Sequence, residues 1–460
     1  MSEDLNSDVN SNEISDYEEK SFEKGLYIPH HKEYTNDKEI TRLSWPDRVI
    51  LPLNQHIGET VEPVVEVGEE VKRGQLIGEL DEFWSAPVHA SVSGEVTAIE
   101  ERPAAGGEEI LSVVIDAGEE QPEYQCEESV NWQDLGIQEM KDMLKEYGIV
   151  GMGGAACPTH INVSTDDPVP HLILNGAECE PFLTCDHRMM VEWADKLIEG
   201  ARILFKIIKA EKCHIGVETN KPDAIEVLRD KISDLDNFEV VPLDTKYPQG
   251  YKKSMIKAIT GKEPPMGARS ADVGCIVRNI GTTIAIYEAI ARKKPLFERV
   301  VTVSGPHTVP EAGNYLMPVG TPVRHVLEAT GVDVGAISGH KIIMGGAMTG
   351  TAIGSLDVPV TKSDTGVLLI PPEMAHLGPG EQEKACIRCG KCVSSCPMKL
   401  YPHELSLAAR AGEYMDAEKL HATECAECGI CTFVCPSMRT VAESIMEAKP
   451  HAKKIRRNKD

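Results

Sequence analysis

The sequence predicts a multidomain chain of the α/β plus β class that ends in a small helical module rich in cysteine. Three observations lead to this prediction. Short Val- and Ile-rich segments separated by glycines come first, apolar strands then alternate with long helical stretches, and eight cysteines form two copies of one pattern near the C-terminus. With 460 residues, the chain is long enough for about three domains.

The composition is that of an acidic globular protein. The chain has 73 acidic and 47 basic residues, a formal charge of −26 and 41% hydrophobic residues. So negative a surface repels phosphates, which argues against a nucleic acid partner. The sequence contains neither a signal peptide nor a run of about 18 apolar residues, and clustered cysteines fit a reducing compartment. We therefore expect a cytoplasmic protein.

The N-terminal quarter begins with a polar, acidic stretch, residues 1–24, for which we expect a disordered leader. Residues 25–120 contain the short strand candidates in "GETVEPVVEVGEEVKRGQLIGEL" and "SAPVHASVSGEVTAIE". They resemble a lipoyl-like barrel-sandwich hybrid domain. The lysine that carries lipoate or biotin in such domains is missing from "APVHASVSG", so we expect a scaffold there rather than a swinging arm.

The middle of the chain, residues 121–298, has the alternating pattern of an α/β domain. The strand candidates are "HLILNGA", "KCHIGVE" and "DVGCIVRN", and the helix candidates are "RMMVEWADKLIEGARILFKIIKA" and "KPDAIEVLRDKISDL". This alternation predicts a mainly parallel sheet with flanking helices. Ligands of such folds bind at the carboxyl ends of the strands.

The last third of the chain divides into three parts. Residues 299–375 mix short strands with one helical stretch, which indicates a small α+β module, and "PPEMAHLGPG" then marks a linker. Residues 376–447 contain the two cysteine runs. The basic residues 448–460 are expected to form a solvated tail, although a weak contact with an acidic partner or membrane is the alternative.

Each cysteine run, at 386–397 and 425–436, reads C-x2-C-x2-C-x3-C-P. In proteins with two iron–sulfur cubes, three cysteines of one run hold one cube and the fourth ligates the other. A zinc ribbon uses two pairs of ligands per site, which fits this pattern less well. We therefore predict two [4Fe–4S] clusters. Their predicted ligands are Cys386, Cys389, Cys392 and Cys435 for one cluster, and Cys396, Cys425, Cys428 and Cys431 for the other.

A glycine-rich segment, "GIVGMGGAACPTH" at 148–160, suggests a nucleotide site because glycine lets a ligand approach the backbone closely. The stretch "LILNGAECEPFLTCDHRMM" at 172–190 adds Glu178, Glu180 and Asp186 after a strand. The alternatives are an ordinary glycine turn and a solvated loop with capping carboxylates.

Several long motifs in one order resemble a known family. "VGMGGAACPTH", "NGAECEPFLTCDHRMM", "YPQGYKKSMIKAITGKEPP", "VGCIVRNIGTTIAIYEAI" and "SLDVPVTKSDTGVLLI", followed by the cysteine runs, resemble the RnfC subunit of the Rnf ion-translocating oxidoreductase complex. The resemblance covers about residues 22–447, and that family is similar to the flavin-bearing subunit of complex I. It implies a complex I flavin-subunit-like domain at 121–298, a β-grasp (SLBB) module at 299–375 and a dicluster ferredoxin-like domain at 376–447.

The resemblance also implies a function. Hydride from NADH would reach non-covalent FMN, and single electrons would pass through both clusters to another subunit, at the cytoplasmic face of the membrane. Glu178 and Glu180 would line the nicotinamide and isoalloxazine side together with Asn175, and Asn279 would approach the flavin phosphate. The implied flavin turn consists of Gly151, Gly153, Gly154 and Ala155.

Two positions depart from the family pattern. The family usually has Phe where this chain has Cys157, and Lys where it has Asn162. A similar family, the D-proline reductase-associated electron transfer proteins, can carry selenocysteine in this turn, so Cys157 is a candidate redox thiol whose pKa the nearby helix start would lower. The alternative for Cys157 is a small buried hydrophobe. For the whole chain, the alternatives are a soluble carrier for such a reductase and a flavin-free relay or scaffold.

Overall fold

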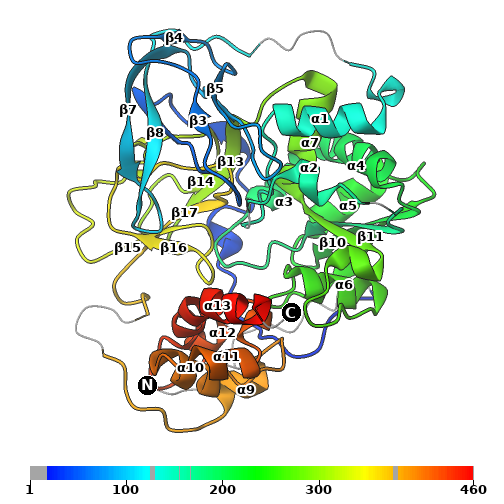
Figure 1. The fold of residues 1–460 in the computed structure, drawn as a ribbon, viewed down its shortest axis with the longest axis vertical. Coiled ribbons are helices and arrows are strands. Elements are labelled where there is room, and N and C mark those ends of the chain that lie inside the picture. The colour runs from blue at the N-terminus through cyan, green and yellow to red at the C-terminus, as the bar shows by residue number, and fades with distance from the viewer. Residues whose placement is uncertain (1–17, 125–129, 155, 166, 377–381, 459–460) are drawn as a thin grey trace.

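The computed structural model describes residues 18–124, 130–154, 156–165, 167–376 and 382–458. Figure 1 places the N-terminal β-sheets and the α/β domain side by side, with a six-stranded sheet next to both and the helical C-terminal module beneath them. The predicted combination of α/β, β and a helical cysteine module is confirmed, since each type of region is present.

The N-terminal β region consists of two small antiparallel sheets around one core. The strands alternate between inward Val, Leu or Ile and outward polar residues, so that side chains such as Leu51, Ile77 and Ile115 are fully buried. The first sheet contains β2 (Arg48–Pro52), β8 (Glu109–Ala117), β7 (Gly94–Pro103) and β4 (Glu70–Val71). The second contains β3 (Glu62–Pro63), β5 (Leu76–Glu79) and β6 (Val88–His89).

The α/β domain has a fully parallel sheet in the order β11-β10-β9-β12. Its strands are β9 (His171–Gly176), β10 (Lys212–Glu218), β11 (Phe238–Leu243) and β12 (Cys275–Asn279). Helix α6 (Lys252–Thr260) contributes to one apolar cluster with the sheet, and the other helices contribute to a second. These helices are α1 (Ile137–Glu146), α2 (Thr159–Asn162), α3 (Cys185–Glu192), α4 (Ala194–Ile208), α5 (Pro222–Lys231) and α7 (Ile280–Arg292). The stretch 188–210 is therefore two helices, with a break at Trp193.

The six-stranded sheet has the order β1-β14-β13-β17-β15-β16 and mixes parallel and antiparallel pairs. Its elements are β1 (Ile40–Arg42), β13 (Glu298–Ser304), β14 (Gly313–Pro318), β15 (Lys341–Met344), β16 (Thr351–Ile353), β17 (Gly366–Ile370) and helix α8 (Val323–Ala329). The edge strand β1 comes from the N-terminal part of the chain, within the range 25–120 that the sequence assigned to the barrel.

The N-terminal residues before β1 lie on the α/β domain instead of belonging to the barrel. Lys20 pairs with Leu243 of β11, and Leu26 pairs with Tyr247. Phe22 is buried, with 8% of its surface exposed. A disordered leader over the whole of 1–24 is therefore wrong for residues 18–24, because these pair with a sheet edge; residues 1–17 lie outside the described residues. We call residues 18–39, which include the short helix η1 (Lys32–Tyr34), the N-terminal strap.

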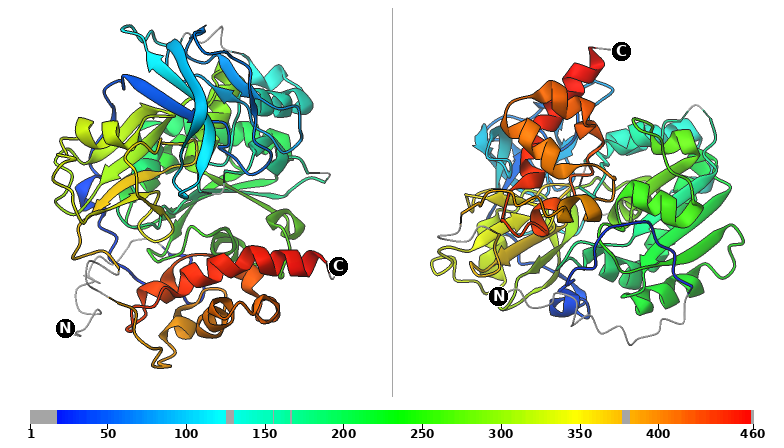
Figure 2. Two further views of the ribbon diagram at one scale, coloured as in Figure 1. Left: turned by 60° about the vertical axis from the view of Figure 1, so that its left-hand side comes forward. Right: turned by 90° about the horizontal axis from the view of Figure 1, so that it is seen from below.

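The C-terminal module packs five helices around a small core. They are α9 (Lys391–Ser395), α10 (Pro402–Arg410), α11 (Tyr414–Lys419), α12 (Ile430–Phe433) and α13 (Val441–Arg457). Figure 2 shows α13 as a long helix along the side of the module that faces the rest of the molecule. The predicted solvated tail at 448–460 is wrong as far as Arg457, because Ala448 and Ala452, one turn apart, are buried and continue the helix.

The remaining short 3-10 helices lie in connections. They are η2 (Trp132–Asp134), η3 (Ser270–Val273) and η4 (Ala422–Glu424).

Candidate functional site

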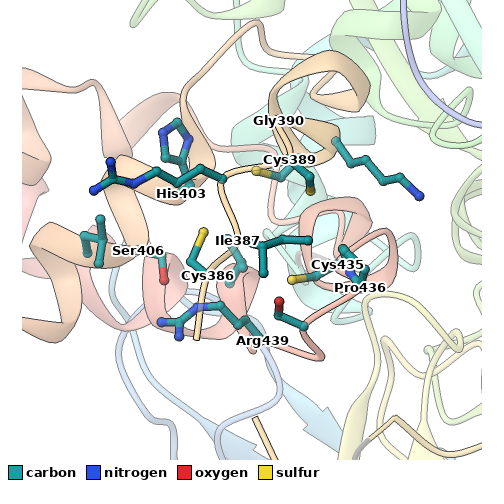
Figure 3. Close-up of a pocket in the computed structure, with 15 residues that line it drawn as sticks. Cys386, Ile387, Cys389, Gly390, His403, Ser406, Cys435, Pro436 and Arg439 are labelled. Carbon is teal, nitrogen blue, oxygen red and sulfur yellow. The ribbon is translucent and has the colours of Figure 1, made fainter. Parts of the chain in front are cut away.

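One cavity in the C-terminal module opens to the surface, and we call it the outer cavity. Its cysteines come from the first run, except for the last one of the second run (Figure 3). Cys386 and Cys389 are exposed, and the loop turns through left-handed backbone at Arg388 (φ 55°) and Gly390 (φ 77°). Such tight turning lets neighbouring thiols face one space. The four cysteines that line the outer cavity are Cys386, Cys389, Cys392 and Cys435.

A second cavity, the inner cavity, lies closer to the α/β domain. Its cysteines are Cys396, Cys425, Cys428 and Cys431. The other lining side chains are apolar or small, including Leu405, Ile430 and Ile445. Gly429 brings this loop against the six-stranded sheet, since a Cβ there would lie 2.6 Å from the carbonyl oxygen of Met348.

The structure thus divides the eight cysteines into the two crossed groups of four that the sequence predicted. Among the described residues, no three His, Cys, Asp or Glu side chains converge as ligands of a single metal ion. Four thiols spread around a cavity fit a cube with an iron at each corner better than they fit zinc. Burial raises the pKa of Cys428 to about 12, so the positive charge of bound iron would be needed to ionise this thiol.

The glycine-rich segment lies between α1 and α2, beside the start of α7. Gly153 is packed against Asn279, since a Cβ at Gly153 would lie 3.2 Å from the Asn279 Cβ. Gly154 has φ 108° and open space where a side chain would be, so a ligand can reach its backbone. Gly151 donates its N–H to the carbonyl of Cys157 at 2.9 Å, which closes the turn. Ala155 lies outside the described residues.

Arg278, at the end of β12, is a site residue that the sequence analysis missed. Its Nε and Nη2 atoms are buried and find no partner among the described residues, while Nη1 donates to the carbonyl of Val277 at 2.8 Å. Burial lowers the pKa of Arg278 to about 10, and this guanidinium lies near the Cys157 thiol and Lys252. A buried guanidinium with free donors beside an open glycine turn fits an anionic group such as a flavin phosphate.

Cys157 is half-buried in the same region, next to Asn162. Burial raises the pKa of its thiol, although the charge of Arg278 and a hydrogen bond from Asn162 oppose this. The expectation of a pKa lowered by a helix start is therefore wrong. Helix α2 is four residues long and provides a small dipole. Burial likewise raises the pKa values of Cys179 and Cys185, the candidate resolving thiols.

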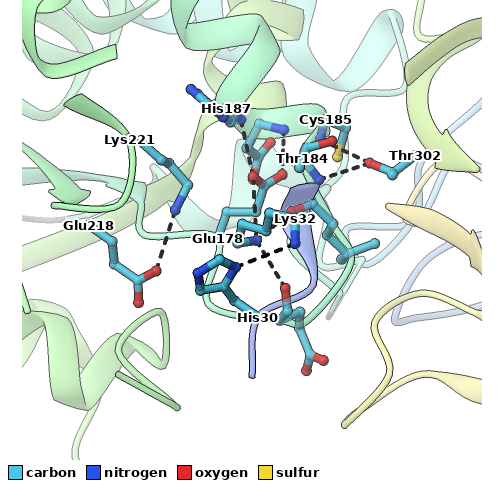
Figure 4. Close-up of polar contacts among 12 residues, drawn as sticks. His30, Lys32, Glu178, Thr184, Cys185, His187, Glu218, Lys221 and Thr302 are labelled. Atoms are coloured by element: carbon cyan, nitrogen blue, oxygen red, sulfur yellow. Dashed lines mark hydrogen bonds and ion pairs between the residues drawn. The ribbon is translucent and has the colours of Figure 1, made fainter. Parts of the chain in front are cut away.

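The acidic stretch after β9 forms a buried polar network (Figure 4). Glu178 has φ 44°, and its carboxylate accepts the backbone N–H groups of Asp186 at 2.6 Å and His187 at 3.3 Å, which caps helix α3. Lys32 of the N-terminal strap lies 4.0 Å from this carboxylate. Asn175 donates to the carbonyl of Gly250 at 2.9 Å. Glu178 and Asn175 therefore hold the shape of the carboxyl end of the sheet.

Asp186 connects this network to the flavin side. Its carboxylate accepts a hydrogen bond of 2.6 Å from the Asn279 amide, whose oxygen in turn accepts the N–H of Thr282 and caps helix α7. Burial, together with the nearby charge of Glu178, raises the pKa of Asp186 to about 7. Asp186 is therefore largely protonated below neutral pH in the folded protein.

Glu180 points toward the inner cavity. Its carboxylate accepts hydrogen bonds from the Thr349 hydroxyl at 2.7 Å and the Met348 N–H at 2.9 Å, and burial raises its pKa. The Tyr247 hydroxyl lies 3.2 Å from Glu180 Oε1 and 2.8 Å from the carbonyl oxygen of Cys428. One side chain thus links the acidic stretch to a cysteine loop of the inner cavity.

Two further buried groups at this end of the sheet lack partners within the described part of the chain. Gln249 is fully buried, and neither atom of its amide is hydrogen-bonded. Glu218, at the end of β10, has one unpartnered oxygen and a pKa that burial raises. Unsatisfied buried polar groups are rare in folded proteins, so their position favours a polar ligand here.

Several residues of this site escaped sequence analysis because their role depends on distant contacts. Lys32 lies almost 150 residues from Glu178, and Tyr247 follows a different strand from Glu180. For Arg278 a signal was present: a cation between an apolar strand and the Asn279 helix cap. Within the described ranges, none of the helices combines the length and apolar character that a membrane crossing requires.

Three family models match the chain. Residues 20–120 match the RnfC barrel sandwich hybrid domain, residues 144–288 the Nuo51 FMN-binding domain, and residues 385–438 a 4Fe-4S dicluster domain. FMN and two [4Fe–4S] clusters are therefore the cofactors of this chain, which is an electron-transfer flavo-iron–sulfur protein and a component of an oxidoreductase. The flavin-free alternative is not supported.

Similar proteins cover almost the whole chain. The RnfC-type subunit of the proton-translocating ferredoxin:NAD(+) oxidoreductase complex of Clostridium ljungdahlii is 41% identical over 403 residues, which is 87% of each chain. The corresponding subunit of the Na(+)-translocating complex of Acetobacterium woodii is 39% identical over 93% of this chain and 96% of its own length. That of the ion-translocating oxidoreductase complex of Klebsiella pneumoniae is 38% identical over 84% of this chain but 51% of that protein.

Among solved structures, an NAD+-reducing [NiFe]-hydrogenase in the air-oxidized state aligns with a TM-score of 0.49 and 16% identity, over 71% of this chain and 63% of that chain. The family follows from the sequence relatives, from the barrel match at 20–120 and from the order of the three domains. On these grounds the chain belongs to the RnfC family of subunits of the ion-translocating ferredoxin:NAD(+) oxidoreductase, or Rnf, complexes.

Proposed function

We propose that the chain takes hydride from NADH at the carboxyl end of the β9–β12 sheet and delivers electrons singly to a protein partner, by way of the inner and then the outer cavity. Bound FMN supplies the conversion from an electron pair to single electrons, and the two [4Fe–4S] clusters supply one-electron carriers. The chain's own residues hold these groups, orient the nicotinamide and separate the two cavities.

The observation that carries this order is the position of Tyr247. Its hydroxyl is within hydrogen-bond distance of both the Glu180 carboxylate, at 3.2 Å, and the Cys428 carbonyl, at 2.8 Å. The acidic stretch therefore adjoins the inner cavity, while the exposed Cys386 and Cys389 belong to the outer one. Electrons that enter at Glu180 have the shorter route through the inner cavity.

We assign the thiolates of each cavity as the ligands of one cluster. The proposed inner ligands are Cys396, Cys425, Cys428 and Cys431. The proposed outer ligands are Cys386, Cys389, Cys392 and Cys435. The support is that each set of four lines one cavity, in the crossed pattern of proteins with two cubes.

For FMN, the proposed backbone contacts come from the glycine turn, Gly151, Gly153, Gly154 and Ala155. Arg278 would hold the phosphate with its two unpartnered nitrogens, and Asn279 would place the N-terminus of α7 beside it. This cation takes over the role of the lysine that Asn162 replaces. Lys252, whose pKa burial and Arg278 lower, adds a second positive charge nearby.

For the nicotinamide, we propose that Glu180 and Glu178 have different roles. Glu180 has a raised pKa and two donors that hold it in place, so it can keep a proton next to the bound nicotinamide. Glu178 is committed to capping α3, so it would act by fixing the loop that carries Glu180. Asn175 would likewise fix the loop at Gly250.

The proposed setting is a multisubunit complex at the cytoplasmic face of the membrane. The similar proteins named above are complex subunits, and the acidic surface disfavours nucleic acid. A soluble carrier that uses Cys157 as a redox thiol is less well supported, because burial raises the pKa of this thiol.

The test is a reduction experiment on protein purified without oxygen. We expect about one FMN and about eight irons per chain, and NADH should bleach the flavin band before the cluster absorption. Cluster reduction by NADH in flavin-stripped protein, at the same rate as in the holoprotein, would contradict the proposal.

A further inference from the structure

The rim of the outer cavity is cationic. Its lining contains Arg388, Lys391 and Arg439 but no Asp or Glu, in a chain where acids outnumber bases 73 to 47. Arg388 and Lys391 are exposed, and Figure 3 shows the Arg439 side chain next to Cys386. The inner cavity, by contrast, has no charged side chain in its lining.

The same rim exposes apolar side chains next to the thiols. Ile387 has 66% and Leu407 56% of its surface exposed, and Cys386 and Cys389 are exposed as well. We call the surface formed by Ile387, Arg388, Lys391, Leu407 and Arg439 the exit face. A few apolar contacts with charges around them are typical of small, transient electron-transfer interfaces.

We propose that the exit face binds a carboxylate-rich one-electron carrier protein, or a carboxylate-rich domain of a partner subunit. The proposal rests on the function proposed above. In each encounter the outer cluster loses one electron and the redox centre of the partner gains one, and no bond or proton is exchanged.

Charge complementarity selects this partner. A chain with a formal charge of −26 repels an acidic protein over most of its surface, so that the exit face becomes the favoured point of approach. The repulsion elsewhere orients the partner with its redox centre toward the exposed thiols. An anionic membrane would also be attracted to these cations, but it offers no acceptor for the electron that reaches this surface.

The cations could instead serve the cluster, whose thiolates carry negative charge. That role predicts an altered midpoint potential after charge reversal, without any change in how the transfer rate depends on salt. A docking role predicts a change in the salt dependence.

The experiment measures electron transfer from the NADH-reduced holoprotein to an acidic two-cluster ferredoxin by stopped flow, at low and at physiological salt. Arg388→Glu/Lys391→Glu should slow the second-order step about tenfold or more at low salt and remove most of its salt dependence. The rate for cytochrome c, a basic acceptor, should rise. A matched control is Lys72→Glu/Lys209→Glu, which reverses two exposed charges elsewhere and should leave the ratio of the two rates close to that of the unmodified protein.

A second variant avoids the cysteine loop, in case charge reversal there prevents cluster assembly. Leu407→Asp lies on α10 and should slow transfer to ferredoxin while iron content and bleaching by NADH stay unchanged. Salt-independent transfer in the unmodified protein would overturn the proposal. It would also be overturned if charge reversal shifted only the midpoint potential, or if the exit face bound phosphatidylglycerol vesicles while ferredoxin transfer ignored both variants. Loss of bleaching by NADH in the unmodified protein would instead count against the proposed function.

Discussion

The two cysteine cavities have the same motif but different surroundings. At matching positions of the two runs, Arg388 corresponds to Glu427 and Lys391 to Ile430. Ile430 is buried against the inner cavity, whereas Lys391 is exposed beside the outer one. The cysteine spacing therefore selects the cofactor, and the residues between the cysteines determine which cavity faces the body of the protein and which faces a partner.

Contacts with the rest of the molecule reinforce this difference. The inner loop contacts Tyr247 through the Cys428 carbonyl, and Glu424, just before it, pairs with Lys253 of α6 at 3.0 Å. The outer loop has one such contact in the Lys24 ammonium, which donates to the Val393 carbonyl at 3.3 Å. The inner cavity is thus fixed to the α/β domain, and the outer cavity is left accessible.

The largest expected effect comes from removing one ligand of each cavity. Cys428→Ala should abolish reduction of both clusters by NADH, because the inner cavity comes first. Cys389→Ala should leave flavin and inner-cluster reduction intact but block onward transfer. Iron analysis should give about four irons per chain in both variants, and rapid-freeze EPR distinguishes the reduced species.

Cys213→Ala is the control, since this cysteine is buried in β10 and belongs to neither cavity. If Cys428→Ala retained reduction of the outer cluster at the normal rate, the order inner before outer would be wrong.

The second prediction concerns accessibility. Because Cys386 and Cys389 are exposed, oxidation or a chelator should remove the outer cluster first, about tenfold or more faster than the inner one. Iron release should be biphasic with two equal amplitudes. A single phase would mean that the two cavities do not differ in exposure in solution.

The third prediction tests the entry side. Arg278→Met should weaken FMN binding about tenfold or more, because a charge-assisted hydrogen bond contributes about 1.5–3 kcal/mol. Binding to the apoprotein can be followed through flavin fluorescence, with riboflavin as a ligand that lacks the phosphate. The exposed Arg269→Met serves as the matched control, and equal losses for FMN and riboflavin would count against a phosphate contact.

The fourth prediction tests the link between body and inner cavity. Tyr247→Phe removes the hydroxyl that joins Glu180 and Cys428 and should lower the free energy of unfolding by about 1 kcal/mol. Chemical denaturation of the holoprotein measures this change. Tyr27→Phe, which removes a surface hydrogen bond to Asp244, provides the comparison and should have a smaller effect.

The smallest expected effect is a change in pH dependence at Asp186. The folded protein raises its pKa from 3.8 to about 7, so the folded state binds more protons than the unfolded state over this range. The free energy of unfolding should therefore fall as pH rises from about 4 to about 7.

Asp186→Asn should remove this slope, as measured by denaturation at several pH values. Asp223→Asn is the contrasting control. Burial favours a higher pKa at Asp223, but the His187 contact outweighs it and the pKa is lowered, so its contribution has the opposite sign. A slope that persists in Asp186→Asn would assign it to another group.

Much of the fold could be predicted from local patterns. The parallel strands at 171–176, 212–218 and 275–279 stand out because they are continuous apolar runs, and the two cysteine runs predict paired cubes by spacing alone. The family resemblance predicted from the motifs is confirmed by relatives with up to 41% identity.

What the sequence could not predict depends on contacts between distant segments. Nothing local distinguishes Lys32 from a surface lysine, and its burial next to Glu178 requires the strap to cross the α/β domain. The pKa of Cys157 was predicted in the wrong direction because a helix start is visible in sequence, whereas burial is not. The continuation of α13 depended on two alanines whose burial only the packed module reveals.

The course of the N-terminal strap has a consequence for dissecting this protein. A fragment that began at the α/β domain would lack Lys32, and the carboxylate of Glu178 would remain enclosed without its counter-charge. It would also leave β14 without its parallel neighbour β1. Cutting this chain between its apparent domains would therefore disable two of them at once, and a functional flavin fragment has to keep the residues that precede the barrel.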